Sequence, residues 1–234
     1  MKLAVMQPYF MPYIGYFQML KAVDTFVFYD DVNFIKQGWI NRNRILINDK
    51  DFLFTIPLHK ANSFNLIKDT LINEKLYDNW KRKFLQSITQ NYKKAPNFTE
   101  VNTLINNIFD TACTSISQLA IESVIATSKY LGIETTFFVS SERYQNKDLE
   151  RQERLLDICN KEGATHYINA HGGKELYTKE SFGARGVKLS FIKSNPIVYK
   201  QFNNDFIPWL SMIDVLMFNS IAEVNEMLDN YELV

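Results

Sequence analysis

Acidic, basic and aromatic side chains share one stretch of the chain, YDDVNFIKQGWINRNRI at residues 29–45. Asp30 and Asp31 follow a short apolar run, where paired carboxylates can bind a metal, act as a general base or hold ribose hydroxyls. Residues 32–48 contain no acidic residue. They supply basic residues that can bind phosphate and a tryptophan that can stack on a nucleobase or a sugar. The alternative is a solvated surface loop, and the mixture of residue types favours a ligand site. We predict Asp30 and Asp31 as catalytic and, as binding residues, Lys36, Trp39, Asn41, Arg42, Asn43 and Arg44.

A second candidate is the turn QPYFMPYIGY at residues 7–16, which follows the apolar run KLAV. The turn after the first strand of an α/β sheet lies at the carboxyl edge, where ligands usually bind. Backbone N–H groups at the start of the next helix can hold an anion, and a glycine permits close approach. The alternative is a proline-rich helix start that packs its rings into the core, and position alone favours neither. The candidate binding residues here are Gln7, Tyr9, Tyr13, Gly15 and Tyr16.

A third candidate is HGGK at residues 171–174, between the expected strand HYINA and a helix. A strand–Gly-Gly–helix transition can cradle phosphate through backbone N–H groups, although the spacing is not that of a Walker loop. An imidazole titrates near neutral pH and can transfer protons. We predict His171 as catalytic and Gly172, Gly173 and Lys174 as binding residues.

Charged residues also fill SERYQNKDLERQERLL at residues 141–156. Arg151 and Arg154 are three residues apart and could share one face of a helix that grips phosphate. Glutamates alternate with these arginines, and surface ion pairs of this kind contribute little. The pattern therefore favours a solvated, salt-bridged surface.

Composition excludes several classes of function. The formal net charge is +0, which argues against a nucleic-acid partner. No apolar run reaches the roughly 18–20 residues that a transmembrane helix needs, and no signal peptide is recognisable at the N-terminus. Cys113 and Cys159 lack CxxC spacing and are expected to be buried free thiols. We therefore expect a cytoplasmic protein.

Common catalytic signatures are absent from the sequence. Three histidines and two scattered cysteines give no zinc signature, so no metal ligands are predicted from them. Neither G-x-S-x-G nor G-x-G-x-x-G occurs, which argues against a typical α/β-hydrolase or a Rossmann dinucleotide enzyme.

Hydrophobic periodicity predicts an α/β fold: a central, mostly parallel sheet with flanking helices, a β-hairpin after strand two and a helical insert. Strands are expected at 2–6, 25–29, 135–141, 166–170 and 187–193, and the hairpin around NDKD. Helices are expected at 13–23, 76–92, 98–112, 115–132 and 148–163, with a helical tail from 206. We predict one unit spanning 1–234; a helical subdomain at about 60–130 is the alternative.

Four stretches together resemble the WbqC-like family: QPYFMPYIGYFQML, FVFYDDVNFIKQGWINRNRI, the region ending in YINAHGGKELY, and NPIVYKQFNNDFIPWLSMIDVLMFNS. The resemblance runs in order from residue 6 to about residue 220. The matching positions are Gln7, Pro8, Tyr9, Pro12, Gly15, Tyr16, Asp30, Asp31, Trp39, Asn41, Arg42, Asn43, Gly172, Gly173, Pro196, Tyr199, Pro208, Ser211 and Asp214. Members of this family are typically associated with bacterial surface-glycan gene clusters.

The resemblance implies an enzyme of surface-polysaccharide (O-antigen or capsule) biosynthesis, a transferase acting on a nucleotide-activated sugar or glycan precursor. In this interpretation Lys36, Arg42 and Arg44 hold phosphates, and Asp30 or Asp31 acts as base or binds Mg²⁺. A nucleotidyl- or acyl-transfer step would fit. The alternative is a non-catalytic protein that binds a nucleotide sugar or glycan in an assembly complex. A homodimer is compatible with the sequence.

Overall fold

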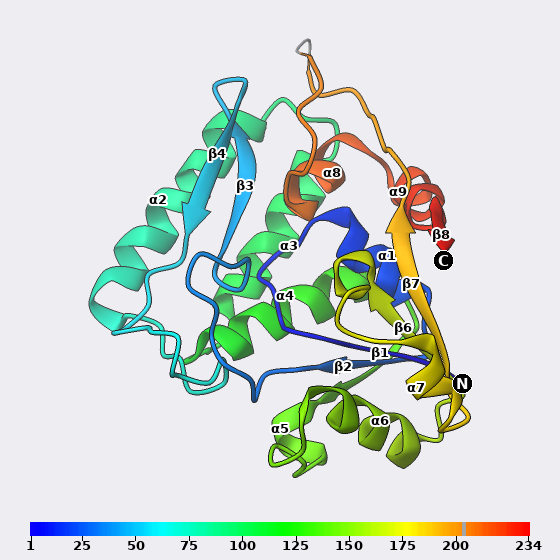
Figure 1. The fold of residues 1–234 in the computed structure, drawn as a ribbon. Helices are drawn as coiled ribbons and strands as arrows, with labels where there is room; N and C mark the ends of the chain where they lie inside the picture. Colours follow the sequence, from blue (N-terminus) through cyan, green and yellow to red (C-terminus); the bar gives the residue numbers. More distant parts are fainter. Residues whose placement is uncertain (203–204) are drawn as a thin grey trace.

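A six-stranded sheet forms the centre of the molecule (Figure 1). The computed structural model describes residues 1–202 and 205–234, so Asn203 and Asn204 of the last resemblance motif lie outside the described residues. The strand order is β5-β2-β1-β6-β7-β8, and every pairing is parallel except that of β8 with β7. The strands are β1 (Lys2–Met6), β2 (Thr25–Phe28), β5 (Thr136–Val139), β6 (His166–Ala170), β7 (Lys188–Ser194) and β8 (Tyr231–Leu233).

The order of the strands creates a switch point between β1 and β6. From β1 the chain moves outward through β2 to β5, then returns to the other side of β1 for β6 and β7. Connections on the two sides of this point therefore run over opposite faces of the sheet. In open α/β sheets, a crevice that can bind ligands forms there, beyond the carboxyl ends of the strands.

Helices cover both faces of the sheet. The helices are α1 (Ile14–Lys21), α2 (Glu74–Tyr92), α3 (Phe98–Asp110), α4 (Ile116–Leu131), α5 (Ser140–Arg143), α6 (Arg151–Glu162), α7 (Lys179–Gly183), α8 (Met212–Phe218) and α9 (Ile221–Leu228), with a 3₁₀ turn η1 (His171–Gly173). Several termini carry the expected signals. Ser115 and Gln118 form a capping box that starts α4, and Gly132 ends α4 in a left-handed conformation.

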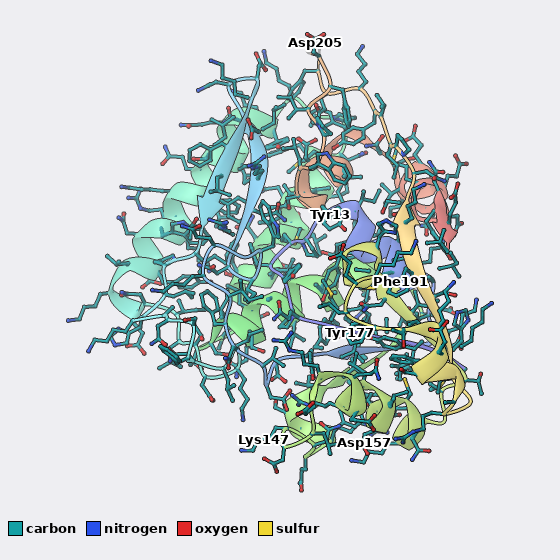
Figure 2. The ribbon with its side chains drawn as sticks, viewed as in Figure 1. Tyr13, Lys147, Asp157, Tyr177, Phe191 and Asp205 are labelled. Atoms are coloured by element: carbon teal, nitrogen blue, oxygen red, sulfur yellow. The ribbon has the colours of Figure 1, made fainter. Side chains whose placement is uncertain are left out.

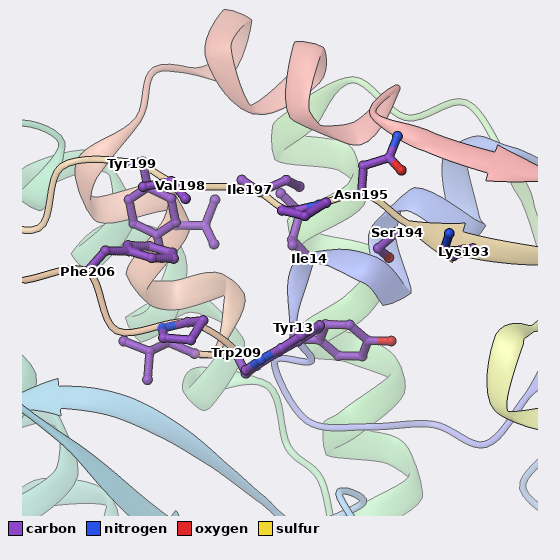
Figure 3. Close-up of a pocket in the computed structure, with 14 residues that line it drawn as sticks. Tyr13, Ile14, Lys193, Ser194, Asn195, Ile197, Val198, Tyr199, Phe206 and Trp209 are labelled. Carbon is purple, nitrogen blue, oxygen red and sulfur yellow. The ribbon is translucent and has the colours of Figure 1, made fainter.

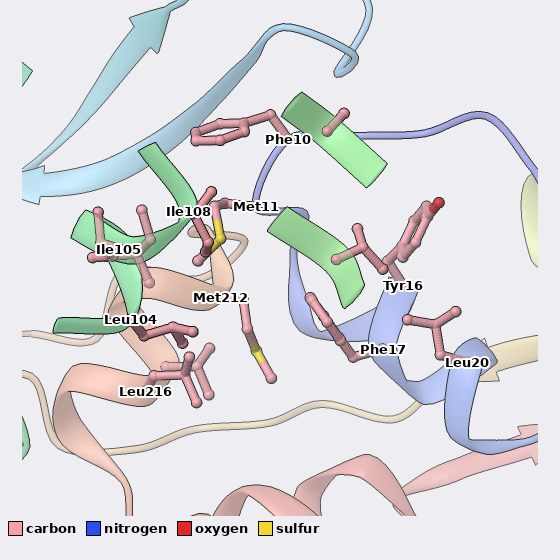
Figure 4. Packing of buried hydrophobic residues seen from close by; sticks show 14 of the residues in the cluster. Phe10, Met11, Tyr16, Phe17, Leu20, Leu104, Ile105, Ile108, Met212 and Leu216 are labelled. Atoms are coloured by element: carbon pink, nitrogen blue, oxygen red, sulfur yellow. The ribbon is translucent and has the colours of Figure 1, made fainter. Parts of the chain in front are cut away.

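Side chains alternate between two hydrophobic clusters on opposite sides of the sheet. Leu3 and Val5 of β1 pack toward α5, α6 and α7, whereas Ala4 faces a larger cluster. That larger cluster joins α1 to α2, α3, α4, α8 and α9. Figure 4 shows part of it, with Phe10, Met11, Leu104, Ile105, Met212 and Leu216 in close packing. Burial on both faces explains why the parallel strands read as apolar runs.

A separate hairpin pairs β3 (Arg42–Ile47) with β4 (Lys50–Thr55). Its two turn residues, Asn48 and Asp49, both have positive φ, as the type of turn that suits right-twisted strands requires. The tyrosine at the end of α2, Tyr92, accepts a 2.7 Å hydrogen bond from the backbone N–H of Leu46. The hairpin is thereby attached to the larger cluster.

The predicted fold class is confirmed: a mostly parallel sheet, flanking helices, the hairpin after β2 and the run of helices α2–α4 are all present. Both cysteines are free, with Cys159 buried and Cys113 half-buried. Within residues 1–202 and 205–234, no helix is both long enough and apolar enough to cross a bilayer.

Candidate functional site

The turn between β1 and α1 is held in place from three distant parts of the chain. Met11 has a φ of 43°, in the left-handed region that residues other than glycine rarely adopt. Its carbonyl accepts hydrogen bonds from Asn43 Nδ2 (2.7 Å) and Ser211 Oγ (2.7 Å). Its N–H donates to Ser123 Oγ (3.0 Å). These bonds fix the turn and so fix the start of α1.

Gly15 allows the ring of Tyr13 to fold back against α1. A Cβ atom on Gly15 would lie 2.4 Å from Tyr13 Cε2 and 2.8 Å from Ser194 Oγ, closer than any real contact. The absence of a side chain therefore brings the Tyr13 ring and the end of β7 together. This close approach is the structural reason for a glycine in a helix, where it otherwise costs stability.

A cavity of about 230 Å³ opens beyond the carboxyl ends of β1, β6 and β7, beside the switch point. His171, Lys193, Ser194 and Tyr13 supply its polar side chains. Its full lining is Met6, Tyr13, Gly15, Tyr16, Met19, Ala170, His171, Gly172, Ile192, Lys193, Ser194 and Trp209. An imidazole for proton transfer and an ammonium group for an anion thus share one cavity.

A larger cavity of about 580 Å³ adjoins the first and shares Tyr13, Lys193, Ser194 and Trp209 with it (Figure 3). The connection from β7 to α8 and the start of α1 form its walls. The lining is Tyr13, Ile14, Lys193, Ser194, Asn195, Pro196, Ile197, Val198, Tyr199, Phe206, Pro208, Trp209, Leu210 and Val215. We call the two the small cavity and the large cavity.

Trp209 lies at the boundary between the small and large cavities. Its backbone has a φ of 62° and its side chain is 70% exposed. Its ring centroid is 6.1 Å from that of Tyr13, and the two rings are tilted by 59°. A large aromatic residue in a strained conformation, presented to solvent beside a cavity, is typical of a ligand-contacting position.

A buried carboxylate holds the wall of the large cavity from behind. Asp214 accepts 2.7 Å hydrogen bonds from the hydroxyls of Tyr92 and Tyr199 and from Gln201 Nε2. Burial raises the pKa of Asp214, and the three donors lower it in part. Because Tyr199 also lines the large cavity, this cluster connects the cavity wall to α2 and α8.

The predicted catalytic acids each have a partner in the structure. Asp30 accepts hydrogen bonds from the N–H (3.0 Å) and the hydroxyl (2.7 Å) of Ser141, and burial raises the pKa of Asp30. Asp31 forms a buried ion pair with Arg154, whose guanidinium lies 4.5 Å from the centre of the Tyr29 ring. Neither acid lines the small or the large cavity.

Arg154 contradicts the expectation of a solvated surface for residues 141–156. Its side chain is buried, because its ion pair with Asp31 joins the start of α6 to the segment that follows β2. Tyr144, Asn146, Leu155 and Leu156 are buried as well, and the other residues of this segment are half-buried or exposed. Lys147 lies at the α5–α6 side of the molecule, well away from Tyr13 (Figure 2).

The predicted binding residues of the hairpin region are not brought to the cavities. Asn41 and Asn43 are buried, and their Nδ2 atoms donate to the carbonyls of Ile56 and Met11. Trp39 lies against two guanidinium groups, at 5.6 Å from that of Arg42 and 5.9 Å from that of Arg44. The Arg42 side chain also donates to the carbonyls of Gly38 and Gln37, Arg44 lies 3.4 Å from Asp51, and Lys36 is exposed. Their binding roles stay predictions.

Of the two remaining predicted segments, the structure brings five residues to the small cavity: Tyr13, Gly15, Tyr16, His171 and Gly172. The Tyr16 hydroxyl donates to the carbonyl of Gln7 (2.9 Å), and the Tyr9 ring lies beside that of Tyr16. Gly173 is closely packed, because a Cβ there would lie 2.5 Å from Asn169 Nδ2. Lys174 is exposed and lies outside both cavity linings.

Sequence reasoning did not single out Lys193, Ser194 or Trp209. Lys193 and Ser194 could have been found from the strand expected at 187–193. Its carboxyl end falls at the same sheet edge as the two candidate segments at residues 7–16 and 171–174. Trp209 follows Pro208 in a connection with no local chemical pattern, so only the three-dimensional structure identifies it. Across the described residues, no group of three or more His, Cys, Asp or Glu side chains could hold a metal.

Comparison with known proteins gives one relative and one family. The chain is 29% identical over 230 residues to the uncharacterized protein Rv1507c of Mycobacterium tuberculosis (strain ATCC 25618 / H37Rv), covering 97% of each chain. No solved structure matches it significantly. The pattern of the WbqC-like protein family matches residues 7–226, a span that includes the β1–α1 turn, the lining of the large cavity, the lining of the small cavity except Met6, and the Asp214 cluster. The chain therefore belongs to the WbqC-like protein family.

Proposed function

We propose that the protein is a transferase of bacterial surface-polysaccharide biosynthesis that binds the sugar of a nucleotide-activated precursor in the small cavity. The observation that carries this proposal is the position of His171, Lys193 and Ser194 around one cavity beside the switch point of a parallel sheet. Ligands of open α/β sheets bind at this place. The family's association with surface-glycan gene clusters supports a sugar as the substrate.

Lys193 is proposed to hold the diphosphate of the precursor. Its ammonium lies 3.9 Å from Glu232 in an exposed pair, an arrangement that contributes little and leaves the lysine able to reorient. A compact positive charge at the mouth of both cavities suits a phosphate group. Trp209 is proposed to stack on the sugar ring, because its exposed face lies at the same boundary.

His171 is proposed to transfer the proton that leaves the accepting group. It occupies the first position of η1, directly after β6, and its side chain is exposed at the small cavity. A histidine in this position can act as a general base without a metal ligand or a carboxylate partner. Asp30 and Asp31 are given no role in this proposal, because each already has a partner.

A non-catalytic protein that binds nucleotide sugars is the second candidate function. The pairing of both predicted acids, with Ser141 and with Arg154, favours it, because a binding protein needs no free general base. In that case His171 would contribute a hydrogen bond to the sugar rather than transfer a proton.

Titration calorimetry with a panel of nucleotide sugars, followed by product analysis, tests the proposal. Lys193→Ala should weaken binding about tenfold or more, since a hydrogen bond to a charged group contributes roughly 1.5–3 kcal/mol. Lys188→Ala, at the opposite end of the same strand, is the matched control and should bind normally. Failure of every nucleotide sugar to bind would refute the proposal.

The role of His171 separates the two candidate functions. His171→Ala should abolish product formation and retain most of the affinity if the protein is a transferase. His59→Ala, an exposed histidine outside both cavities, is the control. Tight binding without any product in the unaltered protein would favour the binding protein.

A further inference from the structure

The walls of the large cavity are apolar along most of their length. Ile14 comes from α1, Ile197 and Val198 from the segment after β7, and Val215 from α8. Phe206 adds a ring that packs edge-on against Tyr199, with 5.0 Å between ring centroids. Figure 3 shows these side chains around one space, with Lys193 and Ser194 together at one end.

Two polar side chains of the wall, those of Tyr199 and Asn195, already make hydrogen bonds within the protein. The Tyr199 hydroxyl donates to Asp214, which leaves the ring to line the cavity. Asn195 Nδ2 donates to Asn230 Oδ1 at 3.0 Å. A nucleobase buried among the apolar side chains of the wall would leave polar groups of its edge unpaired there, at a substantial cost. A hydrocarbon has no such requirement and gains from burial in proportion to its apolar area.

We propose that the large cavity binds an aliphatic hydrocarbon chain, with its anionic head at Lys193 and Ser194, where the head and the diphosphate of the precursor bind in turn. The volume of about 580 Å³ falls within the range of roughly 300–1,000 Å³ that small-molecule sites occupy. Because the cavity shares Tyr13 and Trp209 with the small cavity, the head group of the chain lies next to the proposed sugar position.

Two sources would supply this chemistry: a free fatty acid, whose head is a carboxylate, or a polyprenyl phosphate, whose head is a phosphate. The inference rests on the proposed function only in placing a sugar beside the head of the chain. Both sources place an aliphatic chain and an anionic group at the same two subsites.

The primary test is calorimetric titration of the purified protein with hexanoate, octanoate and decanoate. Affinity should rise about fourfold for each added methylene, because each buried methylene contributes a fixed transfer free energy. Affinity that does not depend on chain length would overturn the proposal. Octanoate and farnesyl phosphate, compared next, distinguish the two sources; binding of neither would also overturn it.

Charged substitutions in the wall locate the chain. Ile197→Glu and Val198→Glu should each weaken decanoate binding by at least about tenfold, because the bound chain would remove the new carboxylate from water without giving it a partner. Val198 is 72% exposed, so its replacement tests the wall with little risk to folding. Leu76→Glu, at an exposed position on α2, is the matched control and should bind normally. Unchanged affinity in both wall variants would place the chain elsewhere and overturn the proposal.

The same variants separate this inference from the proposed function. Ile197 and Val198 line only the large cavity, so their variants should retain nucleotide-sugar binding. Loss of chain binding with intact sugar binding supports the division between the cavities. Chain binding in a protein that binds no nucleotide sugar would refute the proposed function and support the hydrocarbon site.

Discussion

Removal of the Tyr199 hydroxyl tests the Asp214 cluster at a single hydrogen bond. The Tyr199→Phe substitution keeps the ring and its edge-on contact with Phe206, and deletes the 2.7 Å bond to Asp214 Oδ2. Tyr92 and Gln201 still donate to the carboxylate. A hydrogen bond to a charged group contributes roughly 1.5–3 kcal/mol, and one to a neutral group about 1 kcal/mol. We therefore expect a loss of about 2 kcal/mol in the free energy of unfolding while Asp214 is ionised.

The loss should depend on pH, with a sign fixed by the pKa of Asp214. Burial raises this pKa in the folded protein, so the fold prefers the protonated acid. The stability that the group contributes is complete below the unfolded pKa of about 3.9 and falls as pH rises through the folded pKa. Tyr199→Phe removes a donor that favours the carboxylate, which raises the folded pKa further. The variant should lose about 1 kcal/mol while Asp214 is protonated and about 2 kcal/mol once it is ionised, so the loss should not shrink between pH 4 and pH 8.

Urea unfolding of both proteins at the two pH values measures this difference. Tyr130→Phe is the control, because the half-buried Tyr130 hydroxyl makes no hydrogen bond to another described residue. A loss below about 0.5 kcal/mol at both pH values, or a loss that is larger at pH 4 than at pH 8, would refute the assignment of Asp214 as a buried acid held by its donors.

Three further changes test other parts of the molecule. Gly15→Ala should cost about 1–3 kcal/mol in unfolding free energy, because the added carbon overlaps the Tyr13 ring; no loss would mean that the ring moves freely. Arg154→Met leaves Asp31 as an unpaired buried charge and should cost about 3–5 kcal/mol in urea unfolding, and a loss under about 1 kcal/mol would contradict this. Burial raises the thiol pKa of Cys159 to about 12, so mass spectrometry should detect its labelling by a disulfide reagent only after unfolding; rapid labelling of the folded protein would be inconsistent.

The fold was predictable where one local pattern dominates. The strand at 166–170 has the bounds expected from its apolar run, and the helix that ends at Tyr92 follows the three- and four-residue spacing of its buried side chains. Two short elements were not predictable. Residues 140–141 read as a continuation of β5 but begin α5, and Tyr231–Leu233 forms an antiparallel edge strand where a helical tail was expected. Both depend on the packing of neighbouring elements rather than on local pattern.

The candidate site was predictable as an edge of the sheet but not as a set of contacts. The carboxyl ends of β1 and β6 were expected to lie at one edge of the sheet, and residues at both ends line the small cavity. The ion pair of Asp31 was not predictable, because the partner of a charged residue can be far away in sequence. Asp31 pairs with Arg154, 123 residues later, and no local pattern around either residue announces this pair.

Between β7 and α8, some atoms stabilise the fold and others line the large cavity. The Tyr199 ring lines the cavity while its hydroxyl holds Asp214. Gln201 also binds Ile207 within the same segment. Its Oε1 accepts from the N–H of Ile207 (2.7 Å), and its Nε2 donates to the carbonyl of that residue (3.1 Å). The wall should therefore keep its shape when the Tyr199 hydroxyl is removed. We expect Tyr199→Phe to lower stability and leave decanoate affinity unchanged. Ile197→Glu should lower decanoate affinity and leave stability nearly unchanged.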